Sequence, residues 1–460
     1  MMSTLTRRAL LELSSGALGA AFLGGTAPGA LADGPAAAAG STKLYTVFMP
    51  TAPSGDDTNI TPMTNEEIVL RLRRECSGVE FVVRDLTRGA SLSQLLNEAK
   101  DLKRLQYDGV LLCGWPRDYD LLRTGLPTID VAVVNDFQNI PYPLFQQNRV
   151  VGAFLDPWRF CADPNISERM FRDLVDKIKL INSLRRMKSE HILTVTDSQY
   201  VNVIYGDVLK NPPPRYNEMM VGAIAEVFGT RVTKISSKEV TADKEIQDLW
   251  YGESKEANEI AQRWIRNAQK MTYTIESEVV RSAKLYLAMK MLMKKYQATA
   301  ITFHIRTLVK DPRPDELVYP ALGTSEFQLE NTVGKCQSHL NILLSEMLLQ
   351  YAYRRPSMLG DYSVDTYNNV SCVQHCEGPW NPWGDERRVP YILTDHRERR
   401  IRGRRTTGVG AASWVLYPAG ERVTMWQIEV LNKELLLHTG TTVHMLAGPV
   451  KFRDHLWEMM

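Results

Sequence analysis

The sequence lacks a large net charge and long hydrophobic runs. Its 460 residues include 55 Lys and Arg against 53 Asp and Glu, which gives a formal net charge of +2 at pH 7. Proteins that bind nucleic acid or an anionic membrane surface need an excess of positive charge, so we expect neither partner. Beyond the N-terminal segment, no apolar run is long enough to cross a bilayer, so we also expect no membrane span.

The N-terminal segment has the three parts of a secretory signal. Thr6-Arg7-Arg8 is a basic region, an apolar stretch occupies residues 16–25, and Ala30-Leu31-Ala32 is a small-residue cleavage site. The paired arginines are typical of a twin-arginine signal peptide. We therefore predict a signal peptide at 1–32, an Ala/Gly/Pro linker at 33–40, and a mature protein exported to the periplasm or the extracellular space.

Cysteine is scarce, with only six residues in the chain: Cys76, Cys113, Cys161, Cys336, Cys372 and Cys376. An even number of cysteines in an exported protein permits disulfides. The first three lie among hydrophobic residues, where buried free thiols are the usual state. We therefore predict no particular disulfide pairing.

Apolar strands alternate with amphipathic helices over most of the chain, which is too long for a single core. Continuous apolar strands of this kind indicate parallel sheets covered on both faces. We predict an N-terminal α/β domain at 41–165 and a second, Rossmann-like α/β domain at 166–355, whose final helix spans residues 332–353. The fold class is therefore α/β, with two doubly wound parallel-sheet domains followed by a β-rich C-terminal domain at 356–460, where short β-like runs replace helical periodicity.

The densest group of polar side chains lies between Cys336 and Asn381. An aldose–ketose isomerase moves a proton between adjacent carbons, for which it needs a carboxylate base and a group that holds both sugar oxygens. A divalent metal bound by carboxylate and imidazole ligands performs the second task. This cluster therefore contains the residue types that such a reaction requires.

The same region resembles the metal-site region of the L-fucose/L-arabinose isomerase family. The likeness rests on the order of its motifs: Cys336-Gln337, a helix at 340–351, Leu359-Gly360-Asp361, and a strand that ends in His375-Cys376. The turn at residues 417–424 also resembles the Gly-x-x-Val-Thr turn of that family. The likeness covers about the last third of the chain at the level of motifs.

The resemblance implies a ketol-isomerase that acts on a fucose- or arabinose-like sugar through a metal-stabilised enediol. It implies that Asp361 binds Mn²⁺ or another divalent metal and joins in proton transfer, and that His375 is a second metal ligand. It also implies a homo-oligomer, either a trimer or a hexamer. His304, at the end of a predicted strand, and Trp380 and Asn381, on a loop, are candidates for binding the sugar.

Gln337 departs from the family pattern, because it stands where the family has a glutamate that serves as metal ligand and base. An amide cannot accept the proton and is a weak metal ligand. Glu330 and Glu346 are nearby carboxylates, and it stays open whether either replaces the missing base. The family also has a late metal-binding histidine in a segment that would follow Met460, so we expect that the C-terminal domain is truncated or that the site lacks this ligand.

Two other functions compete with that of an isomerase. An exported sugar-binding protein of the same fold, without catalysis, is the main alternative, and Gln337 favours it. A receptor with two similar lobes is disfavoured by the β-rich last domain.

Cys372, His375 and Cys376 are potential zinc ligands. On a strand, however, Cys372 and Cys376 would share one face while His375 points to the other, and no fourth ligand has a zinc-type spacing.

Overall fold

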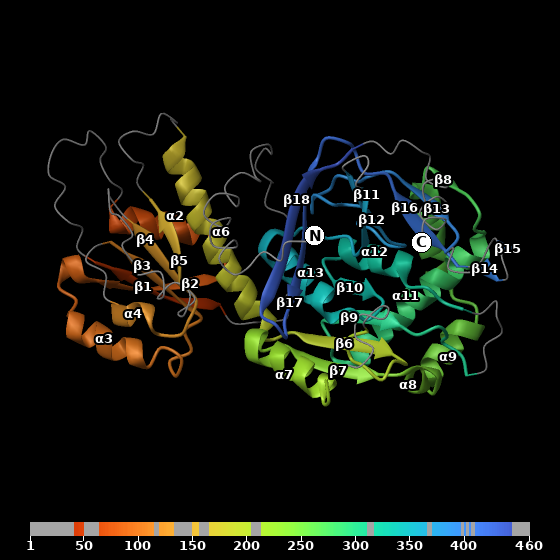
Figure 1. Cartoon of the computed structure of the whole chain (residues 1–460), viewed down its shortest axis with the longest axis horizontal. Helices are drawn as coiled ribbons and strands as arrows, with labels where there is room; N and C mark the ends of the chain where they lie inside the picture. Colours follow the sequence, from red (N-terminus) through yellow and green to blue (C-terminus); the bar gives the residue numbers. More distant parts are fainter. Residues whose placement is uncertain are drawn as a thin grey trace. The chain divides into compact units, whose positions relative to one another are not determined.

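The computed structural model describes residues 41–49, 64–114, 119–132, 150–155, 165–203, 213–310, 317–365, 370–396, 400–401, 404–405 and 410–443. The predicted signal peptide at 1–32 and linker at 33–40 lie outside these residues. The chain forms two compact units, and the boundary between them falls after Arg186 (Figure 1). Each unit has its own parallel sheet and its own core.

The first unit is built on a parallel sheet of five strands in the order β2-β1-β3-β4-β5. The strands are β1 (Thr42–Phe48), β2 (Val79–Asp85), β3 (Gly109–Cys113), β4 (Thr128–Ala132) and β5 (Val150–Phe154). The helices are α2 (Asn65–Glu75), α3 (Leu92–Lys100), α4 (Tyr119–Leu122) and α6 (Ile166–Met187), with a short 3₁₀ turn η1 (Leu86–Arg88).

Alternation along β1 explains why helices cover both faces of this sheet. Leu44 and Phe48 point to one face and pack with buried residues of α2 and α6, whereas Tyr45 and Val47 point to the other and pack with α3 and α4. Successive strand residues face opposite sides, so a strand that is buried on both sides must be apolar at nearly every position.

Helix α6 belongs to this first unit. The sequence placed it at the start of a second domain at 166–355, but its buried residues Phe171, Leu174 and Ile178 pack in one cluster with β1 and β3. The boundary between the compact units is therefore near residue 186, about one helix later than expected.

The second unit contains a parallel sheet of four strands in the order β10-β9-β6-β7. These strands are β6 (His191–Thr196), β7 (Arg231–Ile235), β9 (Ala300–His304) and β10 (Val333–Cys336). The helices are α7 (Tyr216–Phe228), α8 (Ser237–Thr241), α9 (Lys244–Tyr251), α10 (Lys255–Asn267), α11 (Glu276–Tyr296), α12 (Ala321–Leu329) and α13 (Leu340–Tyr353). The single helix predicted at 332–353 was wrong at its start, because Val333–Cys336 is a strand.

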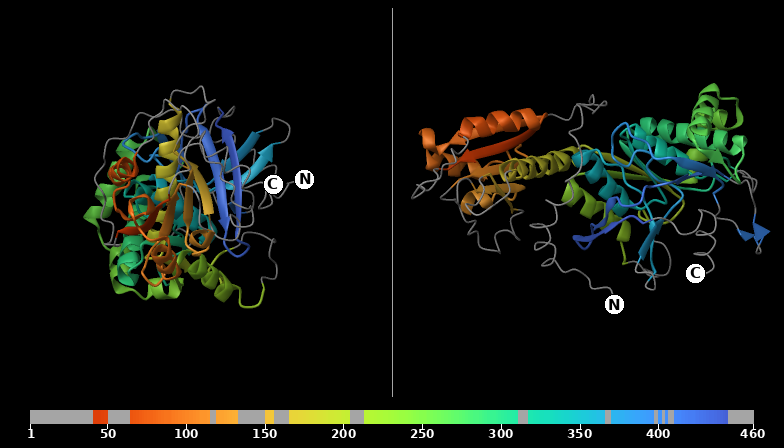
Figure 2. Two further views of the ribbon diagram at one scale, coloured as in Figure 1. Left: turned by 90° about the vertical axis from the view of Figure 1, so that its left-hand side faces the viewer. Right: turned by 90° about the horizontal axis from the view of Figure 1, so that it is seen from above.

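The rest of this unit is β-rich, as predicted. β11 (Asp361–Asp365) pairs with β12 (Val370–Gln374), β14 (Arg400–Ile401) pairs with β15 (Arg404–Arg405), and β17 (Arg422–Glu429) pairs with β18 (Glu434–Thr441). Figure 2 shows the long ribbon formed by β17 and β18 from two further sides.

A small mixed sheet joins the α/β part of the second unit to the β-rich segment. Its order is β16-β13-β8, in which β8 (Lys270–Met271) follows α10, while β13 (Tyr391–Thr394) and β16 (Ala412–Val415) come from the C-terminal segment. The predicted domains at 166–355 and 356–460 therefore share one compact unit after residue 186. The predicted class, two parallel-sheet α/β parts followed by a β-rich part, is confirmed. Among the described helices, none combines the length and apolarity needed to cross a membrane.

Candidate functional site

The candidate site lies where β9 and β10 end. In parallel sheets of this kind, ligands bind beyond the carboxyl ends of the strands. His304 is the last residue of β9, and Cys336 is the last residue of β10. The chain then passes through Gln337 and Ser338 and enters α13 with His339 as its N-cap.

The two residues between β10 and α13 adopt an unusual backbone conformation. Gln337 has φ 71° and Ser338 has φ 53°, both in the left-handed region that residues with a β-carbon avoid. Surrounding hydrogen bonds hold this turn in place: the Gln337 N–H donates to the Phe303 carbonyl at 3.1 Å, and the Ser338 hydroxyl donates to the Val195 carbonyl at 3.3 Å. Backbone strain of this kind is concentrated at functional sites.

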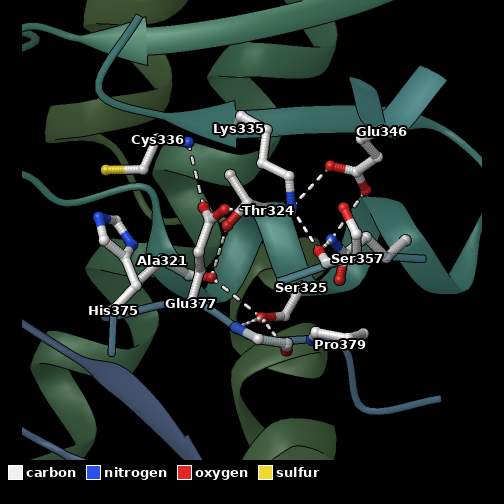
Figure 3. Close-up of polar contacts among 12 residues, drawn as sticks. Ala321, Thr324, Ser325, Lys335, Cys336, Glu346, Ser357, His375, Glu377 and Pro379 are labelled. Atoms are coloured by element: carbon white, nitrogen blue, oxygen red, sulfur yellow. Dashed lines mark hydrogen bonds and ion pairs between the residues drawn. The ribbon is translucent and has the colours of Figure 1, made fainter. Parts of the chain in front are cut away.

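Lys335 is the centre of a buried charged group beside this turn (Figure 3). Its ammonium lies 2.6 Å from Glu346 Oε2 and 3.2 Å from Glu377 Oε1, and it donates to the Ser357 carbonyl at 2.6 Å. The side chains of Lys335 and Glu346 have no solvent exposure, and that of Glu377 has 1%. The ammonium is therefore held by one hydrogen bond and two ion pairs.

Further contacts complete this group. Gln328 donates from Nε2 to Glu346 Oε1 at 2.9 Å, and the Cys336 N–H donates to Glu377 Oε2 at 3.1 Å. Burial lowers the pKa of Lys335, and the Glu377 carboxylate opposes that shift. Because Glu377 contacts both Lys335 and the Cys336 backbone, it joins the charged group to the end of β10.

Two thiols and an imidazole meet next to Glu377. Potential ligand atoms of Cys336, His375 and Cys376 all lie within 4.8 Å of one another, and Cys376 Sγ is 3.5 Å from His375 Nδ1. Both cysteines are buried and free of disulfides. Figure 3 shows the Cys336 sulfur and the His375 ring on the same side of Glu377.

The thiol of Cys376 differs electrostatically from an ordinary buried thiol. A hydrogen bond with Cys336 is the main reason why the pKa of Cys376 is well below its usual value, and the charges of His375 and His396 act in the same direction. At Cys76, by contrast, burial raises the pKa of the thiol to about 12. A thiolate is therefore favoured at Cys376 and disfavoured at Cys76.

His339 lies near two other histidines, His375 and His304. Burial, reinforced by the neighbouring His375 and His304, lowers the pKa of His339 to about 4. The imidazole of His339 is therefore neutral at physiological pH. With the Lys335 ammonium engaged by two carboxylates, the described surroundings of Gln337 suit a neutral ligand better than an anion.

The expectation that Cys376 and His375 point to opposite faces of a strand was wrong. It assumed that both residues lie on a strand, but β12 ends at Gln374 and the chain leaves the sheet before His375. The two side chains thus come together, and Cys336 from β10 joins them. Cys372 is on β12, and its side chain is outside the described residues.

The structure brings the positions of three predicted site residues close together. Asp361 opens β11 and pairs in the ladder with Gln374, which directly precedes His375, although the Asp361 side chain is outside the described residues. Gln337 directly follows Cys336. The residue is buried, at 9% exposure, and its Oε1 has no hydrogen-bond partner among the described residues.

Trp380 and Asn381 lie in a packed part of the structure. One face of the Trp380 ring stacks on Tyr391 with centroids 4.6 Å apart, and only 3% of the residue is exposed. Trp380 and Tyr391 also line a recess of about 740 Å³ beside Trp264, whose lining residues do not include Gln337 or His375. Asn381 is buried, and among the described residues its Oδ1 has no hydrogen-bond partner.

The two carboxylates considered as replacements for the missing base are already engaged. Glu346 forms the ion pair with Lys335. Glu330 accepts a hydrogen bond from the Tyr286 hydroxyl at 2.5 Å and lies 3.3 Å from the Lys290 ammonium. In the described part of the chain, neither carboxylate forms a hydrogen bond with Gln337 Oε1.

The described donors do not fit Mn²⁺. Manganese prefers carboxylate, carbonyl and water oxygens, whereas thiolates and imidazoles select zinc and other softer metals. The donor atoms that converge here belong to two thiols and an imidazole, with a neutral amide next in sequence. The expected manganese chemistry is therefore not supported by the described side chains.

No family model matches the chain, and no curated protein matches its sequence. Among solved structures, it shows similarity to an ABC transporter periplasmic solute binding protein from Actinobacillus succinogenes with bound D-allose. The two are 10% identical, the match covers 72% of this chain and 96% of that chain, and the TM-score is 0.16. At this TM-score the likeness supports no conclusion about fold or ligand.

Proposed function

We propose that this protein binds a neutral, polyhydroxylated ligand, such as a fucose- or arabinose-like sugar, at the carboxyl ends of β9 and β10, without isomerising it. One observation carries the proposal: the amide oxygen of Gln337 is buried at a strand end and has no hydrogen-bond partner among the described residues. Buried acceptors are nearly always satisfied. A sugar hydroxyl is a donor that supplies the missing bond.

Two further features support a neutral ligand and argue against turnover. His339 is neutral at physiological pH, and Lys335 is occupied by Glu346 and Glu377, so an anionic ligand would find no available counter-charge in these groups. Gln337 is an amide and cannot act as the base of an enediol mechanism. Export through the predicted leader would place this binding outside the cytoplasm.

Ketol-isomerisation is a second candidate, because the ladder places Asp361 opposite Gln374 and so near His375. These are the two residues that the family resemblance assigns to the metal. The described donors do not fit manganese, and Glu330 and Glu346 are engaged elsewhere, so this candidate ranks second.

The experiment is calorimetric titration of the full chain with L-fucose, D-arabinose and L-arabinose, together with an assay for ketose formation in the presence of Mn²⁺. We expect binding of at least one sugar and no ketose. Gln337→Met should weaken binding about fivefold, because one buried hydrogen bond contributes on the order of 1 kcal/mol. Gln297→Met, at an exposed position of the same unit, is the matched control.

Two results would overturn the proposal. Ketose formation that disappears in Asp361→Asn would establish the isomerase instead. Equal sugar affinity in the native chain and in Gln337→Met, with both proteins folded, would exclude the amide as a ligand-binding group.

A further inference from the structure

The thiol pair at the end of β10 has the geometry of a metal site. In tetrahedral zinc sites the Zn–S bond is about 2.3 Å and the Zn–N bond about 2.0 Å, so ligand atoms lie about 3.5–3.8 Å apart. Cys376 Sγ and His375 Nδ1 are 3.5 Å apart, and Cys336 provides a third donor, all within 4.8 Å of one another. The separation of Cys376 and His375 therefore matches the S–N spacing of a zinc site, with Cys336 nearby as a third ligand.

The backbone around these ligands is fixed by neighbouring polar contacts. Glu377 directly follows Cys376, and its carboxylate accepts the Cys336 N–H at 3.1 Å, which ties together the two chain segments that carry the thiols. The Ser325 hydroxyl donates to the Gly378 carbonyl at 2.9 Å and holds the segment after Glu377. Supporting contacts of this type orient metal ligands and raise affinity.

We propose that Cys336, His375 and Cys376 bind a soft divalent cation of the zinc class, with the fourth coordination position open to water or another small ligand. Three protein ligands with an open fourth position are typical of catalytic and exchangeable zinc sites, whereas structural sites use four. His375 is partly exposed, whereas the two cysteines are buried. This inference does not depend on the proposed sugar binding.

The competing explanation is a pair of inert thiols. Cys336 and Cys376 pack against Ala321 and Ala412 in a small apolar cluster, as buried free cysteines often do. In that explanation the 3.5 Å contact between Cys376 Sγ and His375 Nδ1 is a thiol–imidazole hydrogen bond, and only metal titration separates the two explanations. Zinc binds thiolates, so metal binding should release any proton that the two thiols still carry, above all that of Cys336.

The test uses the full chain, stripped with a chelator, kept reduced, and titrated with Zn²⁺ and separately with Co²⁺. We expect one equivalent of Zn²⁺, proton release on binding, and a Co²⁺ spectrum with a thiolate charge-transfer band and intense tetrahedral bands. Cys336→Ser, Cys376→Ser and His375→Gln should each weaken Zn²⁺ binding about 100-fold or more. Cys76→Ser, which replaces a buried free thiol elsewhere, is the control and should change nothing.

A second measurement covers variants that fail to fold. In the native chain, Zn²⁺ should protect Cys336 and Cys376 from alkylation while Cys76 is unaffected. Tighter binding of Mn²⁺ than of Zn²⁺, a cobalt spectrum without thiolate character, or equal alkylation with and without Zn²⁺ would each overturn the proposal. So would a Cys336–Cys376 disulfide in the isolated protein combined with no Zn²⁺ uptake after reduction.

Discussion

Lys335 and Glu346 form an ion pair in which neither side chain reaches solvent, with Nζ 2.6 Å from Oε2. A buried pair of this kind is sensitive to the loss of one partner, because the other charge then stays in a low-dielectric environment. Here the loss of Lys335 would leave two carboxylates without a cation, since Glu377 shares the same ammonium.

Lys335→Met should therefore lower the free energy of unfolding by about 3–5 kcal/mol. Adding Glu346→Gln to this variant should recover part of the loss. The matched control is Lys290→Met, which removes a more exposed ion pair with Glu330 and should cost less than about 1 kcal/mol. Denaturant unfolding followed by tryptophan fluorescence measures all three, and equal losses in the two lysine variants would contradict the expectation.

Gly384 should tolerate no side chain. Its φ is +73°, and a β-carbon there would lie 1.8 Å from the Arg354 carbonyl oxygen. Gly420 is a matched control with φ +85° and nothing within 4 Å of the added atom. Gly420→Ala should cost about 1–2 kcal/mol from left-handed strain alone, while Gly384→Ala should cost several kcal/mol or prevent folding. Similar melting temperatures for the two variants would disprove the steric argument.

Strain at Gln337 predicts a conflict between stability and binding. Glycine adopts positive φ without a steric penalty, so Gln337→Gly should stabilise the protein by up to about 1 kcal/mol while it weakens sugar binding. Gln297→Gly replaces the same residue type at φ 53°, at the exposed C-cap of α11, and should give a comparable gain without affecting binding. Thermal unfolding and sugar titration of both variants provide the comparison. A loss of stability in Gln337→Gly alone would show that its side chain contributes to packing.

The lowered pKa of His339 predicts that the folded protein loses stability as the pH falls. Its pKa is lowered to about 4 in the folded protein from an ordinary value of 6.5, so the unfolded chain binds the proton more readily. Stability from this residue is therefore complete above about pH 6.5 and is lost progressively as the pH falls towards 4, by up to about 3 kcal/mol. His339→Gln should flatten the pH dependence in this window, whereas His438→Gln, at an exposed position, should not.

The parallel sheets were predictable because their strands are buried on both faces and therefore apolar throughout. Gly109–Cys113, for example, is buried at every position and was recognised as a strand. β10 was missed because Val333–Cys336 includes Lys335, a residue that argues against a buried strand unless carboxylates from elsewhere in the fold neutralise it. The lysine within this apolar segment was the one feature of the sequence that could have indicated a buried ion pair.

The candidate site was predicted only in part, for a related reason. His375 and Cys376 were recognised as possible ligands, but their partner Cys336 lies about 40 residues earlier and reaches them only through pairing and loop geometry. In addition, β12 ends at Gln374, so His375 does not follow the alternation of the strand and can lie beside Cys376. Neither the point where a strand ends nor the meeting of distant loops follows from local periodicity.

The pairing of β8 with β13 has a consequence for the order of folding. Lys270–Met271 needs a partner strand more than a hundred residues later in the chain, and the Tyr391 hydroxyl donates to the Trp264 carbonyl at 2.7 Å across the same interval. Contacts of such long sequence separation form late, because a large loop must close first. During synthesis, the apolar surface around Trp264 therefore stays partly uncovered until the ribosome has released the segment that contains Trp380 and Tyr391. We expect that surface to be open to aggregation and to chaperone binding during this interval.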